Sequence, residues 1–298
     1  MKDPEPDRAT LAAFGAAVLM AGIAIVCVRL SNRELAPMWG AAVRFAVSSL
    51  VMFAIAAVGR LPLPRGRALT GAMVFGLITF GLSYGLFYVG AVHVPAGLAS
   101  VIMAATPLLT FFLAIVHRDE RFRWRGLAGA VLAIAGITAI STQARGGSLP
   151  PLSVLAILGA AVTAAESGIV IRKIPVPHPV TTNAVAMATG AAALLAFSLA
   201  TGERTGFPAE RSTWLALGYL ALVGTPALFM LFVFVYRRWT ASAASYQFVL
   251  FPIVAVVLAA WLLGEPITAS LLVGARLVLA GVYVGALAPE RRPARVPA

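Results

Sequence analysis

Ten apolar segments follow one another along the 298-residue chain, separated by charged residues, Pro or Gly. They cover residues 10–30, 38–58, 70–91, 96–117, 125–142, 151–171, 181–200, 214–235, 241–263 and 269–287. An α-helix needs about 20 mostly apolar residues to cross the hydrocarbon core of a bilayer. Because 60% of the residues are hydrophobic and only 11% are charged, a conventional soluble enzyme is excluded. The sequence predicts an all-α integral membrane protein with ten transmembrane helices.

The distribution of basic residues agrees with ten helices and indicates how the chain is oriented in the membrane. With both termini in the cytoplasm, the inner segments hold 16 of the 23 Lys and Arg residues and the outer links hold 5. Cytoplasmic loops are generally the ones enriched in Lys and Arg. We therefore interpret the net charge of +12 as a sign of membrane topology, with cytoplasmic N- and C-termini, and expect no nucleic-acid partner. The first segment is expected to be a retained helix, because it is too long for a typical signal-peptide core.

The second half of the chain resembles the first. Residues 95–142 match residues 240–287 without a gap at an offset of 145, with 12 identities in 48 positions. The pairs Pro107/Pro252 and Glu120/Glu265 are the strongest evidence for a repeat, because identities between alanine residues often arise by chance in alanine-rich membrane sequences. Five helices is an odd number, so the second copy would enter the membrane from the opposite face. We predict two inverted five-helix repeats, 1–147 and 148–298, as in many secondary transporters. A duplicated structural scaffold is the alternative.

The duplicated pattern also indicates a family. It reads ASVIMAATPLLTFFLAIVHRDERFRWRGLAGAVLAIAGI in the first copy and ASYQFVLFPIVAVVLAAWLLGEPITASLLVGARLVLAGV in the second. Together with the Arg44-Phe45 pair, this sequence resembles the EamA branch of the drug/metabolite transporter superfamily over nearly the whole chain. Within that branch it is most similar to the YddG-type exporters of aromatic and other amino acids. The resemblance implies a multi-pass protein of the bacterial inner membrane that exports amino acids or related small metabolites.

Residues suited to catalysis are scarce. The chain has no Gly-rich phosphate loop, and Lys2 and Lys173 are its only lysines, so neither an ATP site nor a midmembrane Schiff-base lysine is expected. His93, His117 and His178 lie at segment ends without metal-ligand spacing. We predict no catalytic residue, no metal site and no cofactor. A membrane-embedded lipid-modifying enzyme is the alternative from another class, and a pore or assembly scaffold is the third.

Four residues that break or loosen helices fall in the central segments. Pro107 and Pro252 occupy equivalent midpoints of the fourth and ninth segments, where each removes a backbone hydrogen bond. At the same offset, Gly81 in the third segment corresponds to Pro226 in the eighth. We predict that these four residues are hinges for alternating access; fixed packing kinks are the alternative, because membrane helices tolerate Pro.

Candidate substrate-binding residues lie on the same central segments. Phe80, Tyr84 and Tyr88 share one helical face because they are spaced by four residues. A buried phenol needs a hydrogen-bond partner, which favours a cavity over contact with lipid. The other candidates for the cavity wall are Met103, Phe229, Tyr246, Gln247 and Phe248. The alternative is that the aromatic face only packs against lipid or the protein core.

The charged residues near the segments have two readings each. Glu166, well inside the sixth segment, would bind a proton or a cationic substrate, or would be structural and reach water or Arg172. For Arg44 and Arg276, snorkelling or hydrogen bonds between helices are favoured over contact with substrate. Glu120 and Glu265 are expected to stabilise the starts of the fifth and tenth helices, as carboxylates at the positive ends of the helix dipoles.

The overall prediction is a bacterial plasma-membrane secondary transporter that works by alternating access. Its expected partners are a small-molecule substrate, such as an amino acid, and the lipid bilayer. A multidrug carrier or a carrier of other metabolites from the same superfamily is an alternative. The oligomeric state is left open, a monomer included.

Overall fold

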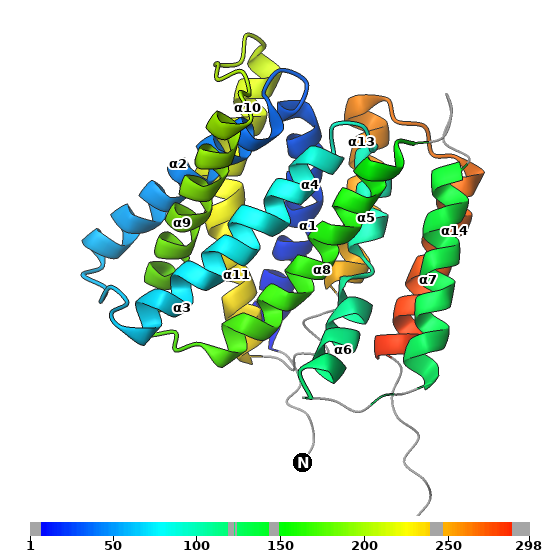
Figure 1. Cartoon of the computed structure of the whole chain (residues 1–298), viewed down its shortest axis with the longest axis horizontal. Helices are drawn as coiled ribbons and strands as arrows, with labels where there is room; N and C mark the ends of the chain where they lie inside the picture. Colours follow the sequence, from blue (N-terminus) through cyan, green and yellow to red (C-terminus); the bar gives the residue numbers. More distant parts are fainter. Residues whose placement is uncertain (1–6, 119–121, 123, 143–148, 239–246, 288–298) are drawn as a thin grey trace, which may run out of the picture.

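A computed structural model of the chain describes residues 7–118, 122, 124–142, 149–238 and 247–287, and it assigns helices and no strands to them. Figure 1 shows a bundle of elongated helices. The elements up to residue 142 are α1 (Arg8–Ser31), α2 (Pro37–Val58), α3 (Arg67–Gly76), the π-helical η1 (Leu77–Ser83), α4 (Tyr84–Gly90), α5 (Ala96–Met103), α6 (Thr106–Val116) and α7 (Trp124–Thr142). From residue 151 they are α8 (Pro151–Lys173), α9 (Pro179–Ala200), α10 (Arg211–Gly218), η2 (Tyr219–Gly224), α11 (Thr225–Arg238), α13 (Gln247–Leu263), α14 (Ala269–Val282) and η3 (Tyr283–Leu287).

The helices begin where the sequence offers caps. Asp7 accepts a hydrogen bond from the backbone N–H of Thr10 across 2.8 Å and so caps α1. The hydroxyl of Thr268 does the same for the Leu271 N–H at the start of α14. Pro lies in the first turn of α2, α8 and α9, where its missing N–H has no intrahelical partner to lose. Local sequence therefore fixes these starts.

Among the described residues, seven helical runs are long and apolar enough to cross a membrane. Each of the kinked runs α3-η1-α4, α5-α6 and α10-η2-α11 supplies one of them. Three shorter apolar helices are Trp124–Ala139, Gln247–Leu263 and Ala269–Gly285. The structure thus agrees with an all-helical membrane protein, and the count of ten crossings stays a prediction.

The outside of the bundle is apolar. Trp261 is 78% exposed and Leu50 is 68% exposed, whereas Phe45 and Phe80 are fully buried. Large apolar side chains exposed in such number suit a hydrocarbon surrounding, because a soluble monomer rarely shows extended apolar patches. The core and the outer surface are therefore both apolar, as expected for a protein that lies in lipid.

The two halves of the chain pack against each other throughout the bundle. α2 lies beside α9 at one edge, and α7 lies beside α14 at the other (Figure 1). α1 packs on α11 and α13, whereas α8 packs on α4, α5 and α6. Each half therefore places its first helix against central helices of the other half, and the interface between the halves runs through the middle of the molecule.

Glycines allow the closest of these contacts. A Cβ added to Gly136 in α7 would lie 2.6 Å from the carbonyl oxygen of Gly274 in α14, and one added to Gly129 would collide with the backbone of Gly281. Small residues let membrane helices approach to backbone contact. The sequence positions of these glycines thus set the spacing of α7 and α14.

Candidate functional site

Arg44 on α2 lies in the middle of the bundle and is only 1% exposed. Its Nε donates a hydrogen bond to Oγ1 of Thr225 on α11 across 2.8 Å, and its Nη1 donates to the hydroxyl of Tyr88 on α4 across 3.3 Å. The other terminal nitrogen, Nη2, is buried without a hydrogen-bond partner. One guanidinium therefore links three helices and still has unused donors.

Aromatic rings surround this guanidinium. The Arg44 Cζ lies 4.9 Å from the ring centre of Phe45 and 5.0 Å from that of Tyr84, within the range of a cation–π contact. Phe80 stacks on Tyr84 with ring centres 6.0 Å apart, and it meets Phe229 of α11 at 4.9 Å. We call Arg44, Phe45, Phe80, Tyr84, Tyr88, Thr225 and Phe229 the Arg44 cluster.

The cluster brings together four of the predicted substrate-binding residues. Phe80, Tyr84, Tyr88 and Phe229 all belong to it, and the hydroxyl of Tyr88 has the partner that a buried phenol needs. Their role toward a substrate stays a prediction. Of the two favoured readings of Arg44, hydrogen bonding between helices is what the structure shows, and snorkelling is wrong, because the side chain is buried.

The predicted residues of the facing wall are only partly placed. Gln247, the first residue of α13, is 1% exposed, and both its Oε1 and its Nε2 are buried without a hydrogen-bond partner. Phe248 packs on Phe251 with ring centres 5.9 Å apart, and Met103 ends α5 and packs on the core. Tyr246 lies outside the described residues. An unsatisfied buried amide is costly, so Gln247 is the strongest candidate of this group.

Glu166 has a partner that the sequence did not indicate. Both of its carboxylate oxygens lie 3.0 Å from Nε2 of His117, which follows α6. The side chains of His117 and Glu166 are 34% and 27% exposed. The pair therefore links the end of α6 to α8, with both side chains partly exposed, and lies outside the Arg44 cluster. The structural interpretation of Glu166 thus has a partner in His117, and a role toward a proton or a cationic substrate stays a prediction.

Three of the four predicted hinges lie at helix irregularities. Gly81 falls inside the π-helical η1, and Pro226 is the second residue of α11, directly after η2. Pro107 is the second residue of α6, just after the break that separates α5 from α6. Pro252 lies inside α13, which continues through it as one helix. Pro and π-helical turns are the usual causes of such irregularities, and movement at them stays a prediction.

The prediction that Glu265 stabilises the tenth helix is wrong about its partner. Its carboxylate accepts hydrogen bonds from the backbone N–H groups of Ala96 and Gly97 across 2.9 and 3.1 Å, at the start of α5. Thr268 caps α14 instead, and Glu120 lies outside the described residues. The physical idea of a carboxylate at a helix N-terminus holds, but the helix is one that lies 168 residues earlier in the chain.

Two further carboxylates at the same end of the bundle act in the same way. Glu203 accepts from the N–H groups of Met38 and Trp39 at the start of α2. Glu34 accepts from the N–H groups of Ala209 and Glu210 at the start of α10. The sequence analysis missed both, because the partners are remote in sequence. We call Glu34, Glu203 and Glu265 the three capping carboxylates.

The environment of Glu34 favours its charged form. The pKa of the Glu34 carboxyl lies below its usual range. The neighbouring Thr213 hydroxyl makes the largest contribution to this shift, and the backbone N–H groups of Glu210 and Ala209 lower the pKa further. Hydrogen bonds to a carboxylate stabilise its ionised form. The contact between the α1–α2 loop and α10 is therefore made by a carboxylate at neutral pH.

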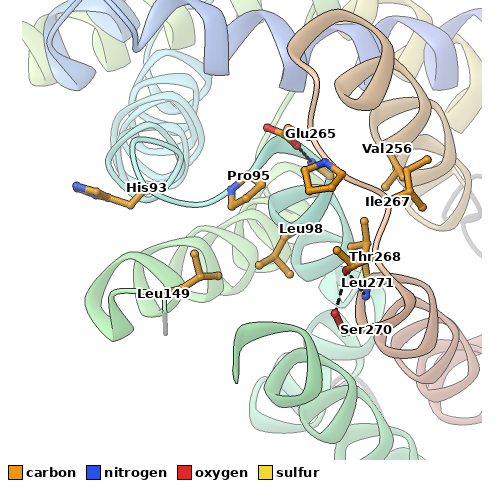
Figure 2. A pocket seen from close by; sticks show the side chains of 12 residues that line it. His93, Pro95, Leu98, Leu149, Val256, Glu265, Ile267, Thr268, Ser270 and Leu271 are labelled. Carbon is orange, nitrogen blue, oxygen red and sulfur yellow. Dashed lines mark hydrogen bonds between the residues drawn. The ribbon is translucent and has the colours of Figure 1, made fainter. Parts of the chain in front are cut away.

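A small cavity of about 230 Å³ lies beside one of these caps. Figure 2 shows it between the start of α5, with Pro95 and Leu98, and the α13–α14 connection, with Glu265 and Ile267. Binding pockets for small molecules commonly measure about 300–1,000 Å³. None of the described substrate-binding candidates lines it. The cavity therefore belongs to the end of the bundle that carries the caps.

The described residues hold no group of three or more His, Cys, Asp or Glu side chains that could bind a metal ion. The fold and the site define a multi-pass helical membrane protein. Its helices are long and apolar, its outer surface carries apolar side chains, and the Arg44 cluster is buried where the two halves meet. Comparison with protein families gives the particular class. The model of the EamA-like transporter family matches residues 8–142 and again residues 151–286. The chain belongs to this family and is a membrane transporter.

Several curated proteins are similar along most of the chain. The uncharacterized inner membrane transporter YedA of Escherichia coli is 28% identical over 270 residues, which cover 88% of this chain and 86% of that protein. A probable amino-acid metabolite efflux pump of Salmonella typhimurium is 29% identical and covers 94% and 95%. A probable terminal-alkyne amino-acid exporter of Streptantibioticus cattleyicolor is 28% identical and covers 81% of each chain.

The fold has a counterpart among solved structures. One crystal structure superposes with a TM-score of 0.69 over 98% of this chain and 100% of the other chain. Its sequence identity is 19%, so the likeness concerns the fold alone.

Proposed function

We propose that this protein is a secondary transporter that exports amino acids, aromatic ones among them, or related small metabolites across the bacterial inner membrane. The observation that carries the proposal is the Arg44 cluster, where polar and aromatic side chains of both halves meet inside a bundle of a transporter family. Relatives named as an amino-acid metabolite efflux pump and as an amino-acid exporter support the substrate class. A relative named as an inner membrane transporter supports the location.

The proposed architecture consists of ten transmembrane helices in two inverted repeats, 1–147 and 148–298, with both termini in the cytoplasm. The directions of the helices support it, since α1 and α8 run in opposite directions (Figure 1). So does the reciprocal packing, in which α1 lies on α11 and α13 while α8 lies on α4, α5 and α6. In this orientation the three capping carboxylates lie at the outer face.

Alternating access is the proposed mechanism. The outer ends of the helices are linked in this conformation by the three capping carboxylates and by Arg29, whose guanidinium donates to the carbonyl groups of Ala91 and Val92 after α4. Opening this face would break such contacts, while Gly81, Pro107, Pro226 and Pro252 would let the central helices bend. Inverted repeats suit this cycle because two equivalent halves can exchange conformations.

The test is solute counterflow into liposomes that contain the purified protein. Liposomes loaded with one unlabelled amino acid should take up the same labelled amino acid transiently, and protein-free liposomes should not. Tyr84→Ala and Gln247→Ala should change the order of preference among aromatic and aliphatic amino acids. A folded protein that exchanges no amino acid or related metabolite would contradict the proposal.

The proposed orientation is tested separately. Cys27 is the one cysteine of the chain, so Cys27→Ala gives a cysteine-free background. Single cysteines introduced before α1 and after residue 290 should both be protected from a membrane-impermeant thiol reagent added to intact cells. Labelling of either end from outside would contradict cytoplasmic termini.

A further inference from the structure

The Arg44 cluster holds a positive charge without a negative one. The partners of the Arg44 guanidinium are a Thr hydroxyl, a Tyr hydroxyl and two aromatic rings, all of them neutral groups. Arg is protonated under all ordinary conditions in proteins. Burying a charge is costly unless it is paired, and ring contacts compensate for only a part of that cost. The cluster is therefore electrostatically incomplete.

The carboxylates that the structure describes are engaged elsewhere. Glu34, Glu203 and Glu265 accept hydrogen bonds from helix N-termini at one end of the bundle. Glu166 lies against His117, and Asp7 caps α1 and lies 3.6 Å from Arg238. The carboxylate of Glu210 accepts from the Ser212 hydroxyl. Within the described part of the chain, no acidic side chain forms an ion pair with Arg44.

The cluster is also arranged to receive an anion. The Nη2 of Arg44 is buried and has no hydrogen-bond partner, although Nε and Nη1 each have one. A guanidinium presents its donors in a planar fork that matches a carboxylate. Of the two rings that contact the guanidinium, Phe45 is fully buried and Tyr84 is partly exposed, so Tyr84 marks the less enclosed side of the cluster.

We infer that Arg44 binds the carboxylate of the transported solute, with the free Nη2 as a donor and the rings of Tyr84, Phe80 and Phe229 against the apolar part. The inference rests on the proposed transport function and names the chemical class of its substrates. Solutes with a free carboxylate are accepted, and organic cations are rejected by the buried guanidinium. This separates an exporter of amino acids or organic acids from a carrier of cationic drugs.

The experiment compares two solutes that differ only in charge, N-acetylphenylalanine and its uncharged amide, on the purified protein in detergent. Binding is measured as thermal stabilisation, beside a panel of the free amino acids and of simple aliphatic and aromatic acids. The variants are Arg44→Lys and Arg44→Met, and Arg276→Met is the control, because Arg276 also lies inside an apolar helix but is exposed. Counterflow of the same solutes is measured in liposomes.

Carboxylates should stabilise the wild-type protein and the Arg276→Met variant, and the matched amides and amines should not. Both Arg44 variants should bind carboxylates about tenfold or more weakly, because a charge-assisted hydrogen bond is lost or misaligned. Arg44→Lys keeps the charge, so carboxylate binding can be measured on this variant if Arg44→Met does not fold.

Three results decide between the two proposals. Stabilisation by carboxylates that depends on Arg44, without counterflow of any solute, supports the inference and contradicts the transport function. Counterflow that treats acid and amide alike, or that survives in Arg44→Lys, overturns the inference and leaves the transport function standing. The absence of Arg44-dependent stabilisation by every carboxylate of the panel also overturns the inference.

Discussion

The Nε of Arg44 and the Oγ1 of Thr225 lie 2.8 Å apart, and this hydrogen bond joins α2 to α11 inside the bundle. Both residues are buried, Arg44 at 1% and Thr225 at 0% exposure. The bond connects the two halves of the chain at the place where solute recognition is proposed. Stability and transport should therefore respond together to changes at this contact.

Thr225→Val should destabilise the protein by about 1–3 kcal/mol, because it keeps the shape but leaves the buried Nε of Arg44 without an acceptor. Thr182→Val is the matched control, since the Thr182 hydroxyl is buried without a hydrogen-bond partner. Its replacement should be neutral or stabilising. Thermal unfolding in detergent measures both variants, and equal losses would contradict the assigned hydrogen bond.

Gln247→Met should leave the fold intact or stabilise it by up to about 1–3 kcal/mol, because an unbranched apolar side chain replaces two unsatisfied polar atoms. At the same time it should change solute preference in counterflow, if the amide serves the substrate. A clear fall in the unfolding temperature would show that the amide is needed for the fold.

Glu265→Gln should loosen the start of α5 by about 1 kcal/mol, because the charge that favours a helix N-terminus is lost. The measurement is hydrogen exchange at the Ala96 and Gly97 amides, whose N–H groups bind this carboxylate. Glu210→Gln is the control, because the Glu210 carboxylate accepts only from the Ser212 hydroxyl among the described contacts. Unchanged exchange at the start of α5 would contradict the cap.

The contact made by Glu34 should weaken in acid. The pKa of Glu34 is lowered in the folded protein, so its carboxylate stabilises the fold above its unfolded pKa of about 4.3. The contribution is lost as the pH falls through the lower pKa of the folded state. The difference in unfolding temperature between wild type and Glu34→Gln should be constant at neutral pH and shrink below about pH 4. A difference that grows in acid would contradict this sign.

Gly81→Ala should fold normally but exchange solute more slowly. An added Cβ would meet the Ala193 Cβ at 3.6 Å, an ordinary contact, while Ala favours regular α-helix over the π-helical turn of η1. Gly76→Ala is the contrasting variant, because its Cβ would collide with the backbone of Ala186 and should prevent folding. If Gly81→Ala shows the wild-type rate of counterflow, the prediction that Gly81 is a hinge is contradicted.

Apolar length and helix breakers could be read from the sequence, because they depend on neighbours along the chain. Pro107 follows the break between α5 and α6, and Pro226 lies in the first turn of α11 after η2, where the missing N–H of Pro is tolerated. The four aromatic candidates on two segments also meet as a group, because helical spacing alone places Phe80, Tyr84 and Tyr88 on one face.

Contacts between remote residues could not be read in the same way. Glu265 was expected at its own helix, but the start of α5 lies 168 residues away in sequence and is brought to it by the packing of α13 on α5. Arg44 lies near a segment end, where a long side chain usually reaches the interface. Here Phe45, Tyr84 and Tyr88 enclose it, and that depends on how α2 and α4 are rotated toward each other.

The glycine contact between α7 and α14 limits how this edge of the molecule tolerates mutation. Because a Cβ at either Gly129 or Gly281 would collide with the carbonyl oxygen of the other, the two helices are in backbone contact at this point. Val131 and Ile134 of α7 are 59% and 63% exposed, so another aliphatic side chain can replace either of them without disturbing the glycine contact. A single methyl group at Gly129, in contrast, would force α7 and α14 apart.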